Sequence, residues 1–490
     1  MLFEPLFTHA LNIPQQIAII DDHGQYTFPQ IAAMATGLGL YLSAQTQKPR
    51  IGLLLPAGAG FVASFYGTLL AGKCVVPINF LLGEREIAHI IADSGIDTIV
   101  SIPQLAARLK DTPLKIVDIT QLPQTPTGLA PKFPSPKSDD MAVLMYTSGT
   151  SGLPKGVILS YGNLQSDVDA AISHAQLVGE HKFLGILPLF HSTGLLASML
   201  APMQLGATTV YIARFSPVST IKAIREHGIS VMAAVPSMYG ALARLKDAGP
   251  ADVQTLYAPL SGGEPLPANI REGFFQKFQK HILEGYGLTE TIGPVTVNVP
   301  RARVAGSVGT PMPGVTIKIT DDDGNALPQG QSGEVWLKGP MIMKGYFNLP
   351  EETAAALTAD GFFKTGDLGR VDEKGFLFIT GRKKDLIIVA GEKAVPREIE
   401  EALMQHPAVA EAAVLGKKDA SRGEVVVAFI VLKEGPSPRP DELKETCRAQ
   451  GLAAFKVPRE IIIVKEFPRS PTGKVLKRLL AEQLDPAPPV

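Results

Sequence analysis

Short apolar runs alternate along the first 300 residues with amphipathic stretches of helical length. Such runs lie at residues 50–55, 98–102, 143–146, 208–212 and 231–235. Strands that alternate with helices need crossover connections, and these connections produce largely parallel sheets covered by helices. The sequence therefore predicts an α/β fold built in layers.

Length and composition limit the classes of protein that are possible. The chain has 490 residues, of which 45% are hydrophobic, so it can fill two or three cores. Its 46 Lys and Arg balance 47 Asp and Glu, and a net charge of −1 gives no long-range field for nucleic acid or an anionic membrane. Partners are therefore expected to be small molecules.

The cysteines and the N-terminus indicate a cytoplasmic location. Cys74 and Cys447 are far apart and show no CxxC spacing, which argues against a disulfide framework and a structural zinc site. The first 12 residues lack the basic and apolar regions of a secretory signal. Residues 51–72 carry no charge, but Pro56 and the small residues after it divide them. A buried strand, turn and helix is expected there and not a membrane span.

The pattern changes twice along the chain. Residues 121–140 contain five prolines and are expected to form a long surface connection. Beyond about residue 310, short strands with turn signals predict a small β-subdomain, with strands at 315–320 and 334–338 around an Asp-Gly turn. After Gly381 a compact α+β unit is predicted, with helices at 397–405 and from 441, and strands at 412–415, 425–432 and 461–464.

The richest motif is the segment 146–157, Tyr-Thr-Ser-Gly-Thr-Ser-Gly-Leu-Pro-Lys-Gly-Val, which follows a predicted strand. Its glycines allow backbone N–H groups to approach phosphates, its hydroxyls donate further hydrogen bonds, and Lys155 supplies a cation. The spacing GxxxxGK[ST] of a P-loop is absent. The segment therefore predicts a polyphosphate-binding loop of another kind.

This loop resembles the signature of the adenylate-forming superfamily, which includes acyl-CoA synthetases, luciferases and the adenylation domains of peptide synthetases. Further blocks match that family in order, at residues 187–191, 261–265, 284–290, 364–367 with 381–385, and 470–474. The resemblance implies a large N-terminal domain of layered α/β subdomains plus a small β-subdomain, residues 1–381. A small mobile α+β C-terminal domain, residues 382–490, would follow, with its hinge near Lys384.

The resemblance also implies which residues bind ATP and Mg²⁺. Tyr286, followed by Gly287, would stack on adenine beside Gly263 and Glu264, although the family often contacts adenine through the backbone at the last position. Thr289 would contact the α-phosphate and Glu290 would bind Mg²⁺, which favours a carboxylate together with phosphate oxygens. Asp367 and Arg382 match the positions that hold the ribose. The β- and γ-phosphates would be held by Thr147, Ser148, Gly149, Thr150, Ser151, Gly152 and Lys155.

The C-terminal domain is expected to serve two half-reactions. Lys474 matches the lysine that contacts the acid's carboxylate and the α-phosphate during adenylation. The lysine ammonium is a point charge on a flexible side chain, so it can reach both groups together. In the family, rotation about the residue matched by Lys384 then removes this lysine and brings in the loop 387–394. A thiol channel would form beside Gly391.

Other classes fit less well. Gly285-Tyr-Gly287 lacks the third glycine of a dinucleotide fingerprint, and neither a GxSxG elbow nor an HExxH pair occurs. A non-catalytic nucleotide-binding module is the main rival from another class, and it would be expected to lack Glu290 or Lys474. The function implied is an ATP-dependent ligase that forms an acyl-adenylate, releases pyrophosphate and transfers the acyl group to a thiol.

The thiol and the acid remain open at this stage. CoA is expected as co-substrate, although residues 282–300, 390–392 and 419–424 also resemble acyl-carrier-protein synthetases. A medium- or long-chain fatty acid is expected, because amino-acid-activating relatives have Asp where this chain has His191, a candidate catalytic residue and gate. Acetate-specific relatives have Trp at the position of Gly287. An aryl acid is the alternative. The residues expected to line the path for the acid are Phe190, Ser192, Thr193, Val235, Tyr239, Gly287 and Gly293.

Overall fold

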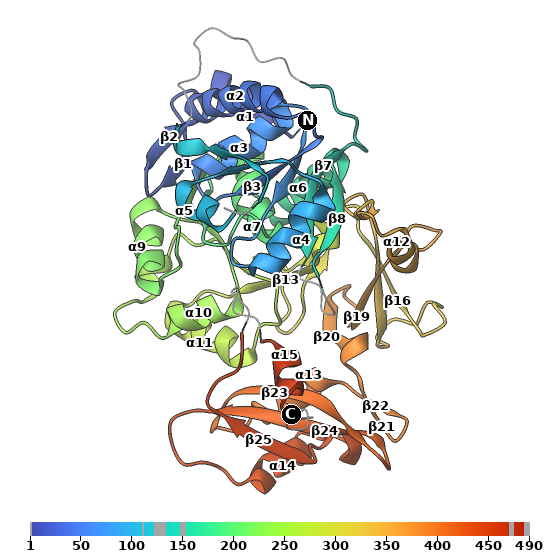
Figure 1. Ribbon diagram of the computed structural model, residues 1–490. Coiled ribbons are helices and arrows are strands. Elements are labelled where there is room, and N and C mark those ends of the chain that lie inside the picture. Colours follow the sequence, from blue (N-terminus) through green and yellow to red (C-terminus); the bar gives the residue numbers. More distant parts are fainter. Residues whose placement is uncertain (1, 110–111, 122–133, 148–152, 470–474, 485–490) are drawn as a thin grey trace. The chain divides into compact units, whose positions relative to one another are not determined.

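A computed structural model describes residues 2–109, 112–121, 134–147, 153–469 and 475–484. The chain forms two compact units (Figure 1). Unit 1 comprises Met1–Thr316 and Leu337–Phe363, and unit 2 comprises Ile317–Trp336 and Lys364–Val490. The mixed α/β fold that the strand and helix pattern predicts is confirmed.

The larger sheet of unit 1 has nine strands in the order β15-β14-β13-β12-β11-β9-β10-β1-β2. Its central strands are parallel, and the antiparallel pairs lie at its two ends. The strands are β1 (Ile17–Asp21), β2 (Gly24–Thr27), β9 (Lys182–Gly185), β10 (Thr208–Tyr211), β11 (Val231–Ala234), β12 (Ala258–Ser261), β13 (Leu283–Gly287), β14 (Pro294–Val297) and β15 (Thr310–Pro311).

The second sheet of unit 1 has seven strands in the order β18-β8-β7-β4-β3-β5-β6. Neighbouring strands from β7 to β6 in this order pair in parallel. At the other end of the sheet, β8 pairs antiparallel with both β7 and β18. The strands are β3 (Arg50–Leu54), β4 (Cys74–Pro77), β5 (Thr98–Ser101), β6 (Lys115–Asp118), β7 (Met141–Thr147), β8 (Lys155–Ser160) and β18 (Gly345–Tyr346).

Helices connect and cover these sheets (Figure 1). The α-helices are α1 (Glu4–Asn12), α2 (Phe28–Gln45), α3 (Ala59–Leu70), α4 (Glu84–Ser94), α5 (Pro103–Ala106), α6 (Tyr161–Ala175), α7 (Ser192–Leu195), α8 (Ala201–Leu205), α9 (Pro217–His227), α10 (Pro236–Ala243), α11 (Ala268–Phe278) and α12 (Pro350–Ala356). A π-helix spans Leu196–Leu200, and 3-10 helices span Ala107–Leu109, Ile119–Gln121, Pro250–Val253 and Thr289–Thr291.

The uncharged segment at residues 51–72 forms strand β3, a turn and helix α3, as predicted. Gly58 makes the turn with φ +148°, a conformation that side chains other than glycine's rarely allow. The Asp21 carboxylate accepts a 2.9 Å hydrogen bond from the Ala59 N–H at the start of the helix. Within the described ranges, no helix is both long and apolar enough to cross a membrane.

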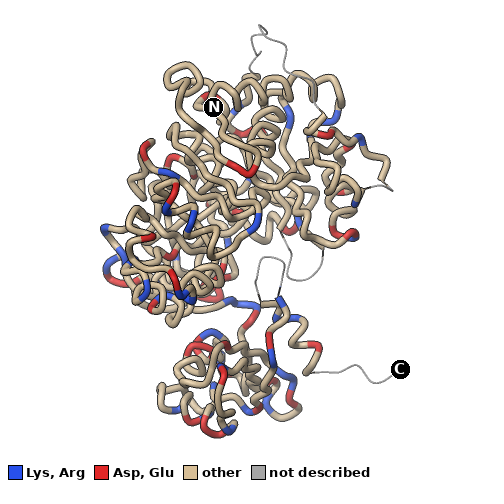
Figure 2. Tube along the Cα trace, turned by 90° about the vertical axis from the view of Figure 1, so that its left-hand side faces the viewer, with Lys and Arg blue, Asp and Glu red and all other residues tan. Residues whose placement is uncertain are grey.

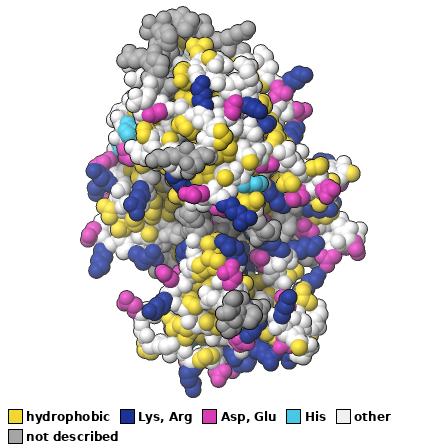
Figure 3. Space-filling model, viewed as in Figure 1, with side chains coloured by type: hydrophobic (Ala, Val, Ile, Leu, Met, Phe, Trp, Pro, Cys, Tyr) yellow, Lys and Arg dark blue, Asp and Glu magenta, His cyan; other side chains and the backbone are white. Residues whose placement is uncertain are grey.

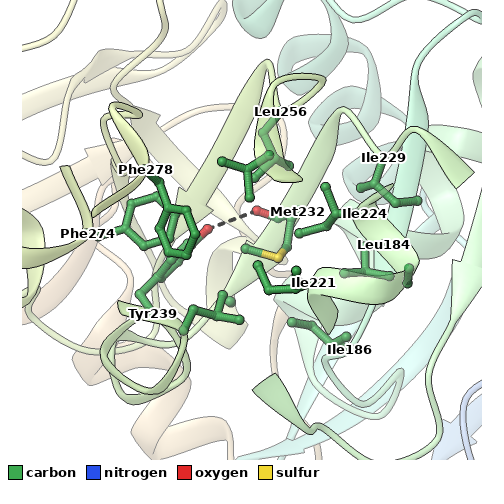
Figure 4. Packing of buried hydrophobic residues seen from close by; sticks show 14 of the residues in the cluster. Leu184, Ile186, Ile221, Ile224, Ile229, Met232, Tyr239, Leu256, Phe274 and Phe278 are labelled. Carbon is green, nitrogen blue, oxygen red and sulfur yellow. Dashed lines mark hydrogen bonds between the residues drawn. The ribbon is translucent and has the colours of Figure 1, made fainter. Parts of the chain in front are cut away.

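A hydrophobic core fills the space between strands β9, β10 and β11 of the nine-stranded sheet and helices α9, α10 and α11 (Figure 4). Tyr239 of α10 is fully buried here, and its ring packs edge-on against Phe274 at 5.1 Å. Its hydroxyl donates hydrogen bonds to the carbonyl oxygens of Met232 and Leu260, at 3.2 and 2.8 Å. Tyr239 is therefore a core residue, and the expectation that it also lines a path for the acid stays a prediction.

Unit 2 includes most of a four-stranded sheet in the order β16-β17-β19-β20, in which β19 and β20 pair antiparallel. A turn at Asp321–Gly324 follows β16, as the Asp-Gly signal predicts, and Gly324 has φ +84°. The strands are β16 (Thr316–Thr320), β17 (Gly333–Lys338), β19 (Phe363–Val371) and β20 (Leu377–Arg382).

The rest of unit 2 is a sheet centred on β24, with apolar clusters on both faces. Val426, Ala428 and Ile430 of β24 belong to one cluster, and Val427 and Phe429 belong to the other, as the alternation of a strand requires. The elements are the 3-10 helix η6 (Lys383–Asp385), β21 (Ile387–Val389), β22 (Glu392–Ala394), α13 (Pro396–Leu403), β23 (Val409–Asp419), β24 (Gly423–Leu432), α14 (Pro440–Ala449), the 3-10 helix Ala454–Lys456, β25 (Glu460–Val464) and α15 (Lys477–Ala481).

Two sequence expectations about this region need comment. The loop expected at residues 387–394 is a β-hairpin, because Ile and Val side chains favour strands and Ala390 and Gly391 supply a turn with positive φ at both residues. The predicted boundary after Gly381 lies inside unit 2, which also includes most of the four-stranded sheet. That boundary stays a prediction.

Charged residues of both signs are interspersed along the chain (Figure 2), in agreement with the net charge of −1. On the face drawn in Figure 3, basic and acidic side chains are again mixed, with hydrophobic side chains between them.

Candidate active site

Two antiparallel strands frame the phosphate loop predicted from the sequence. β7 ends at Thr147 and β8 begins at Lys155, and these two residues lie opposite each other in the strand register. Pro154 is held at the end of the loop by a 3.0 Å hydrogen bond between its carbonyl oxygen and Nε2 of His89. Ser148, Gly149, Thr150, Ser151 and Gly152 lie outside the described residues.

Lys155 has two neighbours that the sequence analysis did not identify. Its ammonium forms an ion pair with the Glu352 carboxylate in the first turn of α12. The same ammonium lies 5.6 Å from the ring centroid of Tyr346, within the range of a cation–π contact. Strand pairing explains the second contact, because Tyr346 lies opposite Val157, two residues beyond Lys155 on the same face of β8.

Tyr346 also contacts the residue expected to bind Mg²⁺. Its hydroxyl donates a 2.8 Å hydrogen bond to Oε1 of Glu290. Burial, together with the charge of Glu290, raises the pKa of Tyr346, so the phenol keeps its proton. The carbonyl oxygen of Glu290 accepts a further hydrogen bond of 2.8 Å from the Met343 N–H. Lys155 and Glu290 are thus brought together by one tyrosine.

The blocks expected to bind adenine meet at one edge of the nine-stranded sheet. β12 and β13 are parallel, with Ser261 opposite Glu284, so the segments after both strands leave the sheet side by side. Gly263 and Glu264 follow β12, whereas Tyr286 and Gly287 end β13. The carboxyl ends of parallel strands are where open α/β sheets bind ligands.

Backbone contacts around this edge explain its glycines. Gly263 has φ +82°, which favours glycine. A Cβ atom at position 287 would lie 1.9 Å from the carbonyl oxygen of Gly293. Gly287 is therefore required by the close approach of the backbone, and the expectation that it leaves a path open for the acid lacks support from the geometry.

Glu290 would contribute one carboxylate to the expected Mg²⁺ site. It follows Thr289 in a 3-10 helix, immediately after the edge that carries Tyr286. Among the described residues, no three His, Cys, Asp or Glu side chains gather as a metal-binding cluster. One carboxylate fits Mg²⁺, which binds through one or two carboxylates together with phosphates of a nucleotide.

His191 lies just before α7 and follows the buried Phe190, whose ring packs edge-on against Phe80 at 5.0 Å. Its Nε2 atom is buried and has no hydrogen-bond partner within the part of the chain that the structure describes. Burial lowers the pKa of His191 to about 4, so the imidazole is neutral near pH 7.

Asp167 of α6 is a buried carboxyl group that the sequence analysis missed. Both carboxyl oxygens lack a partner among the described residues, and burial raises the pKa of Asp167 well above its usual range. A Cβ atom at Gly293 would lie 3.0 Å from its Oδ2 atom and 2.5 Å from Cδ2 of Leu196. Asp167 therefore lies beside the turn that follows Glu290.

The residues expected at the ribose belong to unit 2. Asp367 on β19 and Arg382 on β20 lie opposite each other in the strand register, and Nε of Arg382 is 3.2 Å from Oδ1 of Asp367. The Asp367 N–H donates a 3.0 Å hydrogen bond to Oγ1 of Thr365. The sequence placed these two residues in separate blocks, and strand pairing joins them.

Other predicted residues of unit 2 lie on surface turns. Gly391 is at the turn of the β21–β22 hairpin, beside a surface hollow of about 630 Å³ that is also lined by Lys418 and Arg422. Lys384 lies in η6, where burial and the neighbouring Arg382 lower its pKa. Lys474 lies outside the described residues.

The strands that flank the expected phosphate loop, the turn with Tyr286 and the Glu290 carboxylate all lie in unit 1, as expected for an α/β enzyme that binds a nucleotide. The family model "AMP-binding enzyme" matches residues 6–347, and "AMP-binding enzyme C-terminal domain" matches residues 398–474. The chain belongs to the AMP-binding enzyme family, the adenylate-forming superfamily that includes the acyl-CoA synthetases.

Relatives identify the class of reaction. The chain is 36% identical to a long-chain-fatty-acid–CoA ligase of Bacillus subtilis, over 97% of this chain and 93% of the relative. It is 32% identical to a feruloyl-CoA synthase of Amycolatopsis, over 95% of each. The structure of o-succinylbenzoate CoA synthetase from Bacillus subtilis with its acyl-adenylate intermediate has a TM-score of 0.86, 30% identity and 97% coverage of each chain.

Other relatives are named sulfoacetate–CoA ligase and malonate–CoA ligase. The protein is therefore an acid–thiol ligase of a family that uses ATP and CoA. These names give no support to acyl carrier protein as the acceptor.

Proposed function

We propose that the protein activates a medium- or long-chain fatty acid as its acyl-adenylate and transfers the acyl group to CoA. In the first step a carboxylate oxygen attacks the α-phosphorus of ATP, and the bond to pyrophosphate breaks. In the second step the thiol sulfur attacks the acyl carbon, the thiol proton is released, and AMP leaves. Both steps need positioning and charge compensation by the protein.

In this proposal, different residues bind the phosphates, hold Mg²⁺ and align the carboxylate. Thr147 and Lys155 bind the β- and γ-phosphates, and Thr289 binds the α-phosphate. Glu290 holds Mg²⁺, which when bound neutralises phosphate charge. Lys474 aligns the carboxylate with the α-phosphorus, and a rotation at Lys384 then exchanges it for the hairpin that carries Gly391.

The observation that carries the choice of acid is the neutral, buried imidazole of His191 at the position where amino-acid-activating relatives have Asp. A substrate ammonium placed there would be buried without a countercharge, which costs several kcal/mol. The buried Phe190 and the partly buried Phe80 pack against each other and add an apolar surface nearby. The similarity to a long-chain-fatty-acid–CoA ligase supports the same acid class.

An aryl acid is the second candidate, and the similarity to a feruloyl-CoA synthase favours it. The proposal is tested by measuring kcat/KM with ATP and CoA along a saturated series from C2 to C18, and with benzoate, cinnamate, ferulate, malonate, sulfoacetate and several amino acids. Each methylene buried is expected to contribute about 0.8 kcal/mol until the acyl site is full. A maximum at acetate, or a clear preference for aryl acids, would contradict a fatty acid. Replacing CoA by holo-acyl carrier protein tests the thiol.

A further inference from the structure

Two groups of opposite charge at the phosphate side of the site converge on Tyr346. Its ring faces the Lys155 ammonium at 5.6 Å, and its hydroxyl donates a 2.8 Å hydrogen bond to Oε1 of Glu290. Lys155 is further held by the Glu352 carboxylate. The proposed function assigns Lys155 to phosphate binding and Glu290 to Mg²⁺, but it gives Tyr346 no role.

The backbone holds Tyr346 firmly. β18 pairs with β8, and the Phe347 N–H donates a 2.7 Å hydrogen bond to the carbonyl oxygen of Gly156. The Tyr346 N–H itself donates to Oγ1 of Thr353 at 2.9 Å. Because β8 is also the strand that begins at Lys155, the tyrosine is fixed to the element that ends the phosphate loop.

The hydrogen bond restricts the Glu290 carboxylate. The carboxylate of Glu290 accepts this hydrogen bond at Oε1, and a phenol hydroxyl bound there restricts rotation of the carboxylate group. Groups that bind a metal ligand in this way orient it, and losing one typically lowers metal affinity or activity by about 10- to 100-fold.

We propose that Tyr346 is a positioning residue for adenylate formation, which holds the Glu290 carboxylate for Mg²⁺ through its hydroxyl and the Lys155 ammonium for phosphate through its ring. This inference rests on the proposed function. It concerns only the adenylation half-reaction, because acyl transfer to the thiol requires neither the β- and γ-phosphates nor their metal ion.

Tyr346→Phe isolates the hydroxyl, since phenylalanine keeps the ring that faces Lys155. We expect the Mg²⁺ concentration for half-maximal adenylate formation to rise about tenfold, with thioester formation from supplied acyl-adenylate unchanged. Binding of Mn²⁺ in the presence of ATP, followed by electron paramagnetic resonance, should weaken by a similar factor. ATP binding in EDTA should stay the same.

Tyr257→Phe is the matched control, because the Tyr257 hydroxyl donates a 3.2 Å hydrogen bond to the carbonyl oxygen of Ala175, away from these residues. Its Mg²⁺ dependence should equal that of the wild type. Unchanged Mg²⁺ and Mn²⁺ dependence in Tyr346→Phe would overturn the inference.

A double-mutant comparison separates this inference from the proposed function. In a Glu290→Gln background, Tyr346→Phe should have no further effect on Mn²⁺ binding, because the hydroxyl acts through the carboxylate. Independent effects of the two substitutions would overturn the role of Tyr346, even if one variant were less stable. If Glu290→Gln alone leaves Mg²⁺ dependence unchanged, or the wild type forms no acyl-adenylate, the proposed function fails and the inference that rests on it fails with it.

Discussion

Gly287 lies so close to the carbonyl oxygen of Gly293 that a Cβ atom at position 287 would be 1.9 Å from that oxygen. The contact arises where β13 pairs with β14, at an irregularity in the register between Tyr286 and Gly287. Glycine at this position therefore serves the backbone next to the turn that is expected to bind adenine.

Gly287→Ala is expected to destabilise unit 1 by about 2 kcal/mol or more, because the close neighbour is backbone and cannot rotate away. Gly273→Ala is the control. It lies inside α11 with no atom within 4 Å of the added Cβ, and should stabilise by about 0.5–1 kcal/mol. Thermal unfolding of both variants checks the prediction. An unaltered midpoint for Gly287→Ala would show that the strand pair can relax.

The neutral imidazole of His191 predicts a loss of stability in acid. Its pKa is lowered to about 4 in the folded protein, whereas an unfolded chain protonates near 6.5. Between these values the unfolded state binds the extra proton, so stability falls as the pH falls from about 6.5 to about 4, by up to about 3 kcal/mol. His191→Gln should lose less stability over this range. His23→Gln, at an exposed turn, should follow the wild type in urea unfolding at each pH.

The raised pKa of Asp167 predicts the opposite dependence. Above about pH 3.9 the unfolded chain releases this proton while the folded protein keeps it, so stability falls as the pH rises towards the folded-state pKa. Asp167→Asn removes the titration and should raise the thermal midpoint more at pH 8 than at pH 5. A lower midpoint at pH 8 would mean that the carboxyl group has a stabilising interaction.

Lys474→Ala is expected to slow adenylate formation by about a thousandfold, because it removes the charge that aligns the carboxylate with the α-phosphorus. Thioester formation from supplied acyl-adenylate should survive. Lys477→Ala is the control, since Nζ of Lys477 lies 2.6 Å from Oε1 of Glu400 and is assigned no part in the chemistry. Equal losses in both half-reactions of a folded Lys474→Ala protein would contradict its role.

Lys384→Pro tests the hinge. Proline restricts φ and disfavours a helical conformation at Lys383, which lies in η6. Adenylation should persist while single-turnover transfer to CoA slows. Lys384→Ala removes the ammonium but leaves the backbone free, so it should transfer at nearly the wild-type rate. Equal transfer rates in the two variants would remove Lys384 as the hinge.

Much of this protein is determined by local sequence. The strands at residues 50–54 and 98–101 and the helix α3 follow from apolar runs with turn signals between them, because burial and turn chemistry act over a few residues. The composition of segment 146–157 also predicts phosphate binding, and this stays a prediction.

Only the tertiary structure decided which distant residues meet. Tyr346 and Glu290 are 56 positions apart, and Lys155 and Glu352 are 197 apart. Glu352 lies in the acidic first turn of α12, and no local pattern specified Lys155 as its partner. Strand order and register join Tyr346 to Lys155 and made Gly287 a position of close backbone approach, whereas helix packing made Tyr239 a core residue. These pairings depend on hydrogen bonds between remote strands, which no local pattern specifies.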